Sequence, residues 1–186
     1  MPKRVLALQT LMLSLVVTLT ACSSSPTTPI LNFASSQTSA QAKTSMMSVK
    51  QVRLMDQRQN KALSVINGVN SPVDPNLTNK LQNWLTSSIQ TNPNGRLNID
   101  INLLSYASYV NQATMNFTAE SMMEWQVLVT GKDGYSWKKT YQTTINQEGP
   151  LKMGNSDIET HLNKMASKLL NMTLNDSDFK TALTQQ

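Results

Sequence analysis

Few side chains in this sequence of 186 residues could carry acid–base chemistry. Glu120 and Glu124 are of the type that a glycoside hydrolase uses as its carboxylate pair, and His161 is the only histidine. The two glutamates alternate with the apolar positions of a predicted strand, so we expect them to point to solvent. His161 lies at the edge of the apolar stripe of a predicted helix, which favours a boundary position over a catalytic one. The sequence therefore favours a protein that is not an enzyme.

Motifs for nucleophiles, phosphates and metals do not occur in the sequence. No serine lies in a nucleophile-elbow pattern, and the segment Gly-Lys-Asp-Gly at residues 131–134 is typical of a hairpin turn and not of a phosphate-binding loop. One cysteine and one histidine exclude a cysteine-based zinc cluster and a multi-histidine metal site. We accordingly expect no metal and no cofactor.

The most suggestive polar cluster is Asp56-Gln57-Arg58, at the end of the first predicted strand. Loops set on a rigid scaffold often carry function, so Asp56 and Arg58 are candidate partner-binding residues. The alternative is a turn in which Asp56 caps the backbone and Arg58 is solvated. Two later strands supply the further candidates Met122 and Tyr141. Met122 belongs to an adjacent pair of methionines, one of which must face away from the core, although ordinary core filling is the alternative for such residues.

The single cysteine, Cys22, follows an N-terminal segment typical of secretion. Lys3 and Arg4 supply a positive start, and residues 5–19 form an apolar run of 15 residues. This run is shorter than the roughly 20 residues that a membrane-spanning helix needs, so residues 1–21 are predicted to be a signal peptide. Its removal lowers the formal net charge from +5 to +3. Such a weakly basic chain of mixed charge is not expected to bind nucleic acid.

The run Leu19-Thr20-Ala21-Cys22 resembles the lipobox of bacterial lipoproteins. The resemblance implies that a diacylglyceryl group alkylates the Cys22 thiol, that the chain is cleaved before Cys22, and that a fatty acid such as palmitate acylates the new amine. Two or more acyl chains anchor a protein stably to a membrane. By the sorting rule of enteric-type bacteria, the serine that follows Cys22 implies the outer membrane, with the protein facing the periplasm.

Beyond the cysteine, the chain divides into a tether and one domain. Residues 22–45 are mostly Ser, Thr, Gln, Ala and Pro, a composition that predicts a flexible tether. An apolar island within it, Ile30, Leu31 and Phe33, is either mobile and loosely placed on the domain or a docking segment for a partner. Residues 46–186 are predicted to form a single periplasmic domain, which is long enough to bury a core.

Periodicity in the domain predicts a strand at residues 46–55, a short strand at 62–66, a helix that starts at Asp74, three long strands with a bulge near Leu104, and two C-terminal helices. The capping box Ser156-x-x-Glu159 marks the first of these helices and Asp176 caps the second. Antiparallel strands with one polar face need helices on the other face. The predicted fold is therefore α+β, a two-layer sandwich with a mainly antiparallel sheet of 4–5 strands, two main helices and a short C-terminal helix.

This layout resembles the YajG-type outer-membrane lipoproteins of gammaproteobacteria. The matching features include the lipobox at Cys22, the Asp-Gln-Arg motif after the first strand, Lys61-Ala62-Leu63 just beyond it and the paired C-terminal helices. The chain departs from the family in its longer Ser/Thr linker and its sparser glycines near the first strand. The family has no established activity, so the resemblance implies no catalytic, metal or cofactor residue.

The sequence favours a non-catalytic, membrane-anchored binding or accessory module for another component of the cell envelope, with an envelope protein as the expected partner. The open sheet edge that an antiparallel meander can leave supports this function. The alternative is a carrier or binding module for a lipid, a peptide or a glycan, which predicts an apolar groove between the sheet and the helices. A peptidoglycan hydrolase is less favoured, and it predicts that Asp56, Glu120, Glu124 and His161 converge in one cleft. The oligomeric state stays open.

Overall fold

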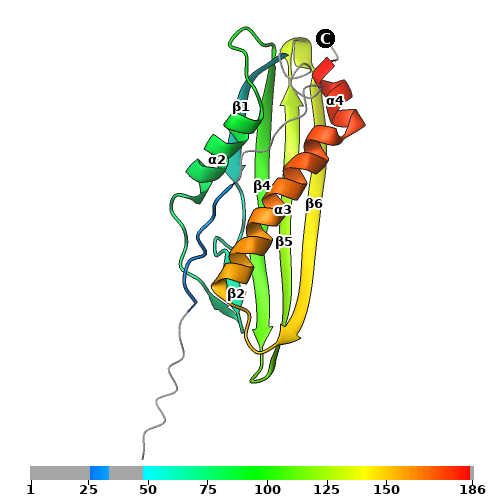
Figure 1. Ribbon diagram of the computed structural model, residues 1–186. Helices are drawn as coiled ribbons and strands as arrows, with labels where there is room; N and C mark the ends of the chain where they lie inside the picture. Colours follow the sequence, from blue (N-terminus) through cyan, green and yellow to red (C-terminus); the bar gives the residue numbers. More distant parts are fainter. Residues whose placement is uncertain (1–25, 34–47, 185–186) are drawn as a thin grey trace, which may run out of the picture.

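The computed structural model describes residues 26–33 and 48–184, which form one layer of helices on one face of a six-stranded sheet (Figure 1). Cys22, the predicted signal peptide and the rest of the predicted tether lie outside the described residues. Among the residues that are described, no helix is both long enough and apolar enough to cross a membrane. The predicted α+β fold class is confirmed.

Three long strands dominate the sheet, and shorter strands complete one side of it. The order is β3-β2-β4-β5-β6, with β1 also paired to β4. β4, β5 and β6 form an antiparallel meander, whereas β1 and β2 run parallel to β4, so the sheet is mixed. In chain order the strands are β1 (Val49–Asp56), β2 (Ser64–Ile66), β3 (Val69–Asn70), β4 (Leu97–Gln112), β5 (Asn116–Thr130) and β6 (Ser136–Pro150).

The strands β1 and β2 share one edge of β4 and leave an interval between them. The pairing of β1 ends where Asp56 lies opposite Leu103, and the pairing of β2 begins where Ser64 lies opposite Ser108. The register of β4 against β5 shifts between Leu103 and Ser105, which confirms the predicted bulge. Part of the β4 edge therefore has no strand beside it on this side.

Alternation along β5 separates a buried face from an open one, as its period of two predicts. The side chains of Phe117, Met123 and Trp125 are buried, whereas Thr118 and Glu120 are exposed. The buried face is covered by α2 (Leu77–Ser88), α3 (Asn155–Asn175) and α4 (Ser177–Thr184). None of the described helices lies on the opposite face of the sheet, which we call the open face (Figure 1). The side chains of β5 and β6 on this face are exposed or half-buried and largely polar.

Two of the predicted helix starts differ from the structure. Asp74 accepts a hydrogen bond from the backbone of Asn76 at 2.8 Å, but α2 begins only at Leu77. In α3 the cap residue is Gly154, whose backbone N–H donates to the Asp157 carboxylate at 3.2 Å, so the predicted Ser156–Glu159 capping box was wrong. The helix α4 follows Asp176, which accepts hydrogen bonds from two backbone N–H groups of its first turn, as predicted.

Residues 26–33, the N-terminal strap, lie against the helices instead of extending away from the domain (Figure 1). Leu31 is 4% exposed and belongs to the hydrophobic core. The ring of Phe33 lies 5.3 Å from that of Trp84 on α2. On α3, the Glu159 and Asn163 side chains accept hydrogen bonds from the backbone N–H groups of residues 30 and 32, at 2.8 and 3.0 Å. This part of the expected flexible tether is therefore packed onto the fold, because alternate apolar residues enter the core between the polar contacts.

Replacing Leu31 tests whether the strap is part of the folded domain. Leu31→Ala removes a buried side chain, so it is expected to lower the free energy of unfolding by about 2–4 kcal/mol in urea denaturation. Ile30→Ala is the matched control, because Ile30 is 65% exposed and its replacement is expected to cost less than about 0.5 kcal/mol. Equal effects of the two substitutions would contradict a docked strap.

Candidate functional site

The Asp-Gln-Arg motif forms a buried ion pair at the interval between β1 and β2. The Arg58 guanidinium donates through Nε and Nη2 to the two carboxylate oxygens of Asp56, at 3.0 and 2.9 Å. Its Nη1 donates to the backbone carbonyl of Tyr106 in β4 at 3.2 Å. Tyr106 lies between the segments of β4 that pair with β1 and with β2. Arg58 therefore satisfies part of the β4 edge that neither strand reaches.

Lys61 completes this cluster as a second cation beside the Asp56 carboxylate. Its ammonium donates to the backbone carbonyl of Asp56 at 2.9 Å and lies 3.0 Å from the carboxylate. Burial alone would raise the pKa of Asp56, but the hydrogen bonds from Arg58 and Lys61 outweigh it and lower the pKa to about 2. The Arg58 side chain is 2% exposed, so the geometry favours a role for Arg58 in holding the fold over partner binding.

The other two sequence candidates lie on opposite faces of the sheet. Met122 is half-buried on the open face, where the Gln142 amide lies 3.2 Å from its sulfur. Tyr141 is 5% exposed on the helix-covered face, opposite Trp125 of β5. Burial and the Asp176 carboxylate raise the pKa of Tyr141. The four candidates therefore do not share one surface.

The titratable residues of the hydrolase hypothesis are also scattered. His161 is buried, with Nδ1 3.2 Å from the Ser121 hydroxyl, which lies 2.8 Å from the Ser108 hydroxyl. Both serines are fully buried and His161 is 8% exposed, so the three side chains lie within the core. This burial lowers the pKa of His161. Glu120 and Glu124 lie on the open face instead. Within the described ranges, no group of three His, Cys, Asp or Glu residues could hold a metal ion.

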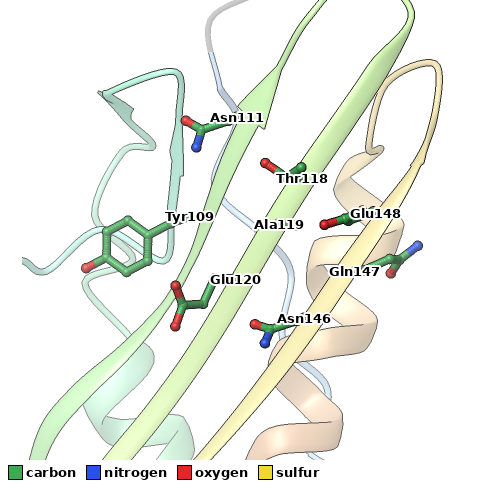
Figure 2. Close-up of a pocket in the computed structure, with 8 residues that line it drawn as sticks. All are labelled: Tyr109, Asn111, Thr118, Ala119, Glu120, Asn146, Gln147 and Glu148. Atoms are coloured by element: carbon green, nitrogen blue, oxygen red, sulfur yellow. The ribbon is translucent and has the colours of Figure 1, made fainter.

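A shallow groove of about 370 Å³ crosses the open face near the end of β4 (Figure 2). Two cross-strand rows build it, and each row takes one residue from β4, β5 and β6. The rows are Tyr109–Glu120–Asn146 and Asn111–Thr118–Glu148. The sequence predicted that Glu120 faces solvent, but only the register of the three strands could have shown which amides and carboxylates lie beside it.

Among the described residues, no strand pairs with the outer edge of β6, which is the last strand in the sheet order. Two hydrogen bonds reveal the phase of the β5–β6 ladder, because Leu151 donates to the Met115 carbonyl at 2.9 Å and Gly131 donates to the Tyr135 carbonyl at 3.0 Å. In an antiparallel ladder, bonded and non-bonded pairs alternate. The odd-numbered residues of β6 therefore bond to β5. The N–H and C=O groups that point outward belong to Lys138, Thr140, Gln142, Thr144, Asn146 and Glu148.

The ion pair at Asp56 makes stability depend on acid pH. Because the folded pKa is about 2 and the ordinary value is 3.8, the stabilisation is complete above pH 3.8 and is lost as the pH falls toward 2. Asp56→Asn is expected to cost roughly 2–3 kcal/mol at neutral pH and to flatten this acid dependence, as measured by urea denaturation over a pH series. Asp178→Asn, at a carboxylate that is 64% exposed, is the matched control and should keep the wild-type pH profile. An unchanged acid profile in Asp56→Asn would refute the assignment.

A family model described as an uncharacterised lipoprotein matches residues 35–184. No curated protein matches the chain.

Three solved structures are similar at 11% sequence identity. A Xanthomonas campestris protein of the family model DUF330 aligns over 79% of this chain and 93% of its own, with a TM-score of 0.40. A minor lipoprotein from Acinetobacter baumannii aligns over 73% and 93%, with a TM-score of 0.39. A protein described as a lipoprotein from Caulobacter crescentus aligns over 77% and 96%, with a TM-score of 0.35.

Proposed function

The chain belongs to a family of uncharacterised lipoproteins, and from this premise we propose that it is a non-catalytic accessory module that binds an extended segment of another envelope protein along β6. The proposal includes the finer assignments that the sequence suggests. These are lipidation and acylation at Cys22, the outer membrane as its location, the periplasm as the compartment that the domain faces, and kinship with the YajG-type lipoproteins. The scatter of Glu120, Glu124 and His161 supports a role other than catalysis.

The observation that carries this proposal is the outer edge of β6, from Ser136 to Pro150, with which no strand of residues 26–33 or 48–184 pairs. A free strand edge presents a row of N–H and C=O groups that a second strand can use. Peptide recognition by strand addition draws its affinity from this ladder and its specificity from neighbouring side chains. The alternating outward groups of β6 provide such a ladder, and their side chains lie beside it on the open face.

The composition of this edge supports binding. Soluble proteins commonly protect free edges with charged residues, proline or a bulge. The stretch 140–147 of β6 contains no charged residue and no proline, and no bulge interrupts its pairing with β5. Protection is confined to its two ends, with Lys138 and Lys139 at one and Pro150 at the other. The middle of β6 is therefore left open to an incoming strand.

Proline at position 144 tests strand addition. Thr144 directs its N–H away from β5, so Thr144→Pro removes an outward donor and leaves the β5–β6 ladder intact. With a photoreactive residue at position 142, in-cell cross-linking is expected to yield one dominant envelope protein that Thr144→Pro reduces at least tenfold. Thr144→Ala keeps the backbone donor and should leave the adduct unchanged.

Three outcomes of this experiment would reject the proposal. An adduct that persists in Thr144→Pro would show that the partner does not use the β6 edge. An adduct with the mass of a second copy of this chain would show self-pairing instead of an envelope partner. The absence of any protein adduct would move the function to the ligand-binding alternative. Equal thermal stability of the two Thr144 variants, measured by circular dichroism, shows that the comparison is between folded proteins.

The groove on the open face favours one second candidate, a module that binds a glycan or a peptide. Tyr109 is 42% exposed and stands at one end of a row that continues through Glu120 to Asn146, with Asn111 two residues further along β4 (Figure 2). An aromatic face beside polar groups suits a ligand with an apolar face and polar rim. On the helix-covered face, where the carrier alternative predicted an apolar groove, core side chains that include Leu31 pack between the sheet and the helices.

Calorimetry with soluble peptidoglycan fragments tests this second candidate. Tyr109→Ala is expected to weaken binding by about tenfold, because it removes the exposed ring that the ligand would cover. Met172→Ala is the control, since Met172 is 41% exposed on α3, on the other face of the sheet. Absence of heat with the wild-type protein, or equal affinity in Tyr109→Ala, would reject the groove as a ligand site.

A further inference from the structure

Three strongly exposed apolar side chains lie at one end of the domain, at Val69, Met115 and Leu151. They are 54%, 71% and 64% exposed, and we call them the apolar tip. Met115 lies in the turn between β4 and β5, and Leu151 directly follows β6. Val69 is the first residue of β3, so the three side chains come from three different segments, and no single local feature of the sequence accounts for the exposure of all three.

Hydrogen bonds hold these turns together. The Leu151 N–H donates to the Met115 carbonyl at 2.9 Å, which joins the end of β6 to the β4–β5 turn. Asn67, in the turn between β2 and β3, exchanges hydrogen bonds with the backbone of Gln112 at 3.0 and 2.7 Å, and Val69 directly follows this turn. The tip is therefore a composite surface, built from three segments of the chain near the end of the long strands.

The backbone at Leu151 is unfavourable for its side chain. Its φ is +67°, in the left-handed region where leucine is disfavoured and glycine is at ease. Burial does not explain why a leucine occupies this position, since its side chain is exposed. Residues held in such sparsely populated backbone regions cluster at active sites and at ligand contacts. An apolar side chain held outward at a strained position indicates a surface that contacts something apolar.

The strap begins near the same end of the domain. Thr27 is hydrogen-bonded to Asn155 in the first turn of α3, and Thr28 donates to the Pro72 carbonyl at 3.2 Å. Met153, two residues before α3, accepts a hydrogen bond from the Gln112 side chain at 2.9 Å, which connects this region to the tip. Three residues separate Cys22 from residue 26, so the chain between them spans at most about 14 Å.

We propose that the apolar tip rests in the lipid headgroup region of the membrane that carries the anchor, so that the long strands stand upright on the membrane. The inference rests on the proposed lipidation of Cys22. A phospholipid surface is the occupant that fits, because the short span between Cys22 and the strap holds this end of the domain next to the bilayer. Apolar side chains on turns enter such an interface at a shallow depth, as those of interfacial helices do.

Fluorescence of the full-length lipidated protein tests this orientation. The protein is reconstituted into vesicles of phosphatidylethanolamine and phosphatidylglycerol, with an environment-sensitive fluorophore attached to Met115→Cys. Asn94→Cys is the matched control, because Asn94 is exposed in the turn that precedes β4, at the opposite end. The unsubstituted chain is labelled in the same way. Because Cys22 is its single cysteine, any dye that it takes up shows that the Cys22 thiol carries no lipid.

The expected result is a blue-shifted emission at position 115 that spin-labelled phospholipid quenches at least threefold more than emission at position 94. Leu151→Gly in the Met115→Cys background relieves the strained φ and removes an apolar side chain, so it keeps the fold and is expected to reduce this quenching at least twofold. Equal quenching at positions 115 and 94 would overturn the inference. A blue shift that depends on protein density and resists lipid quenching would indicate contact between two copies and would also overturn it.

Flotation of the vesicles separates this inference from the proposed function. If the protein floats with the vesicles and position 115 stays solvated, the orientation is refuted and the anchor stands. If the protein does not float, and the unsubstituted chain takes up the dye, the anchoring at Cys22 is refuted and the inference falls with it. Neither outcome bears on the β6 edge, which the cross-linking experiment tests separately.

Discussion

The bidentate ion pair between Arg58 and Asp56 allows β1 and β2 to pair with the same edge of β4, and the rest of the structure depends on this pairing. β4 is longer than either of the strands that pair with its first edge, and an interval of unpaired backbone is left between them. Buried backbone carbonyls need a donor, and the Arg58 guanidinium supplies one to Tyr106. Because Asp56 neutralises the buried cation, the chain can leave β1 and rejoin the same edge at β2.

This framework concentrates the packing on one face of the sheet and leaves the other exposed. The helices and the N-terminal strap cover the first face, and Leu31 completes its core. The open face, the outer edge of β6 and the apolar tip remain available for contacts outside the domain. If the tip rests on the membrane, β6 extends away from it, and a partner strand could pair with β6 without approaching the lipid.

Local sequence patterns predicted the elements of this fold well and the long-range contacts poorly. The period of two in β5 correctly predicted that Glu120 points to solvent. The contact between Ser121 and His161 links a strand to a helix and has no local signal. Glu159 was assigned to a capping box because the spacing matched, whereas its carboxylate binds the strap 129 residues away in sequence. The groove is set by cross-strand register, so its rows of polar residues could not be assembled from one strand at a time.

Residue-resolved amide hydrogen exchange of the free, full-length protein is the most direct test of the claim that the edge of β6 is open. The account predicts alternation along β6, with rapid exchange at the even-numbered residues 138–148 and slow exchange at the odd-numbered residues that bond to β5. Uniform protection along β6 would contradict it, because it would mean that a second copy or another part of the chain already covers this edge.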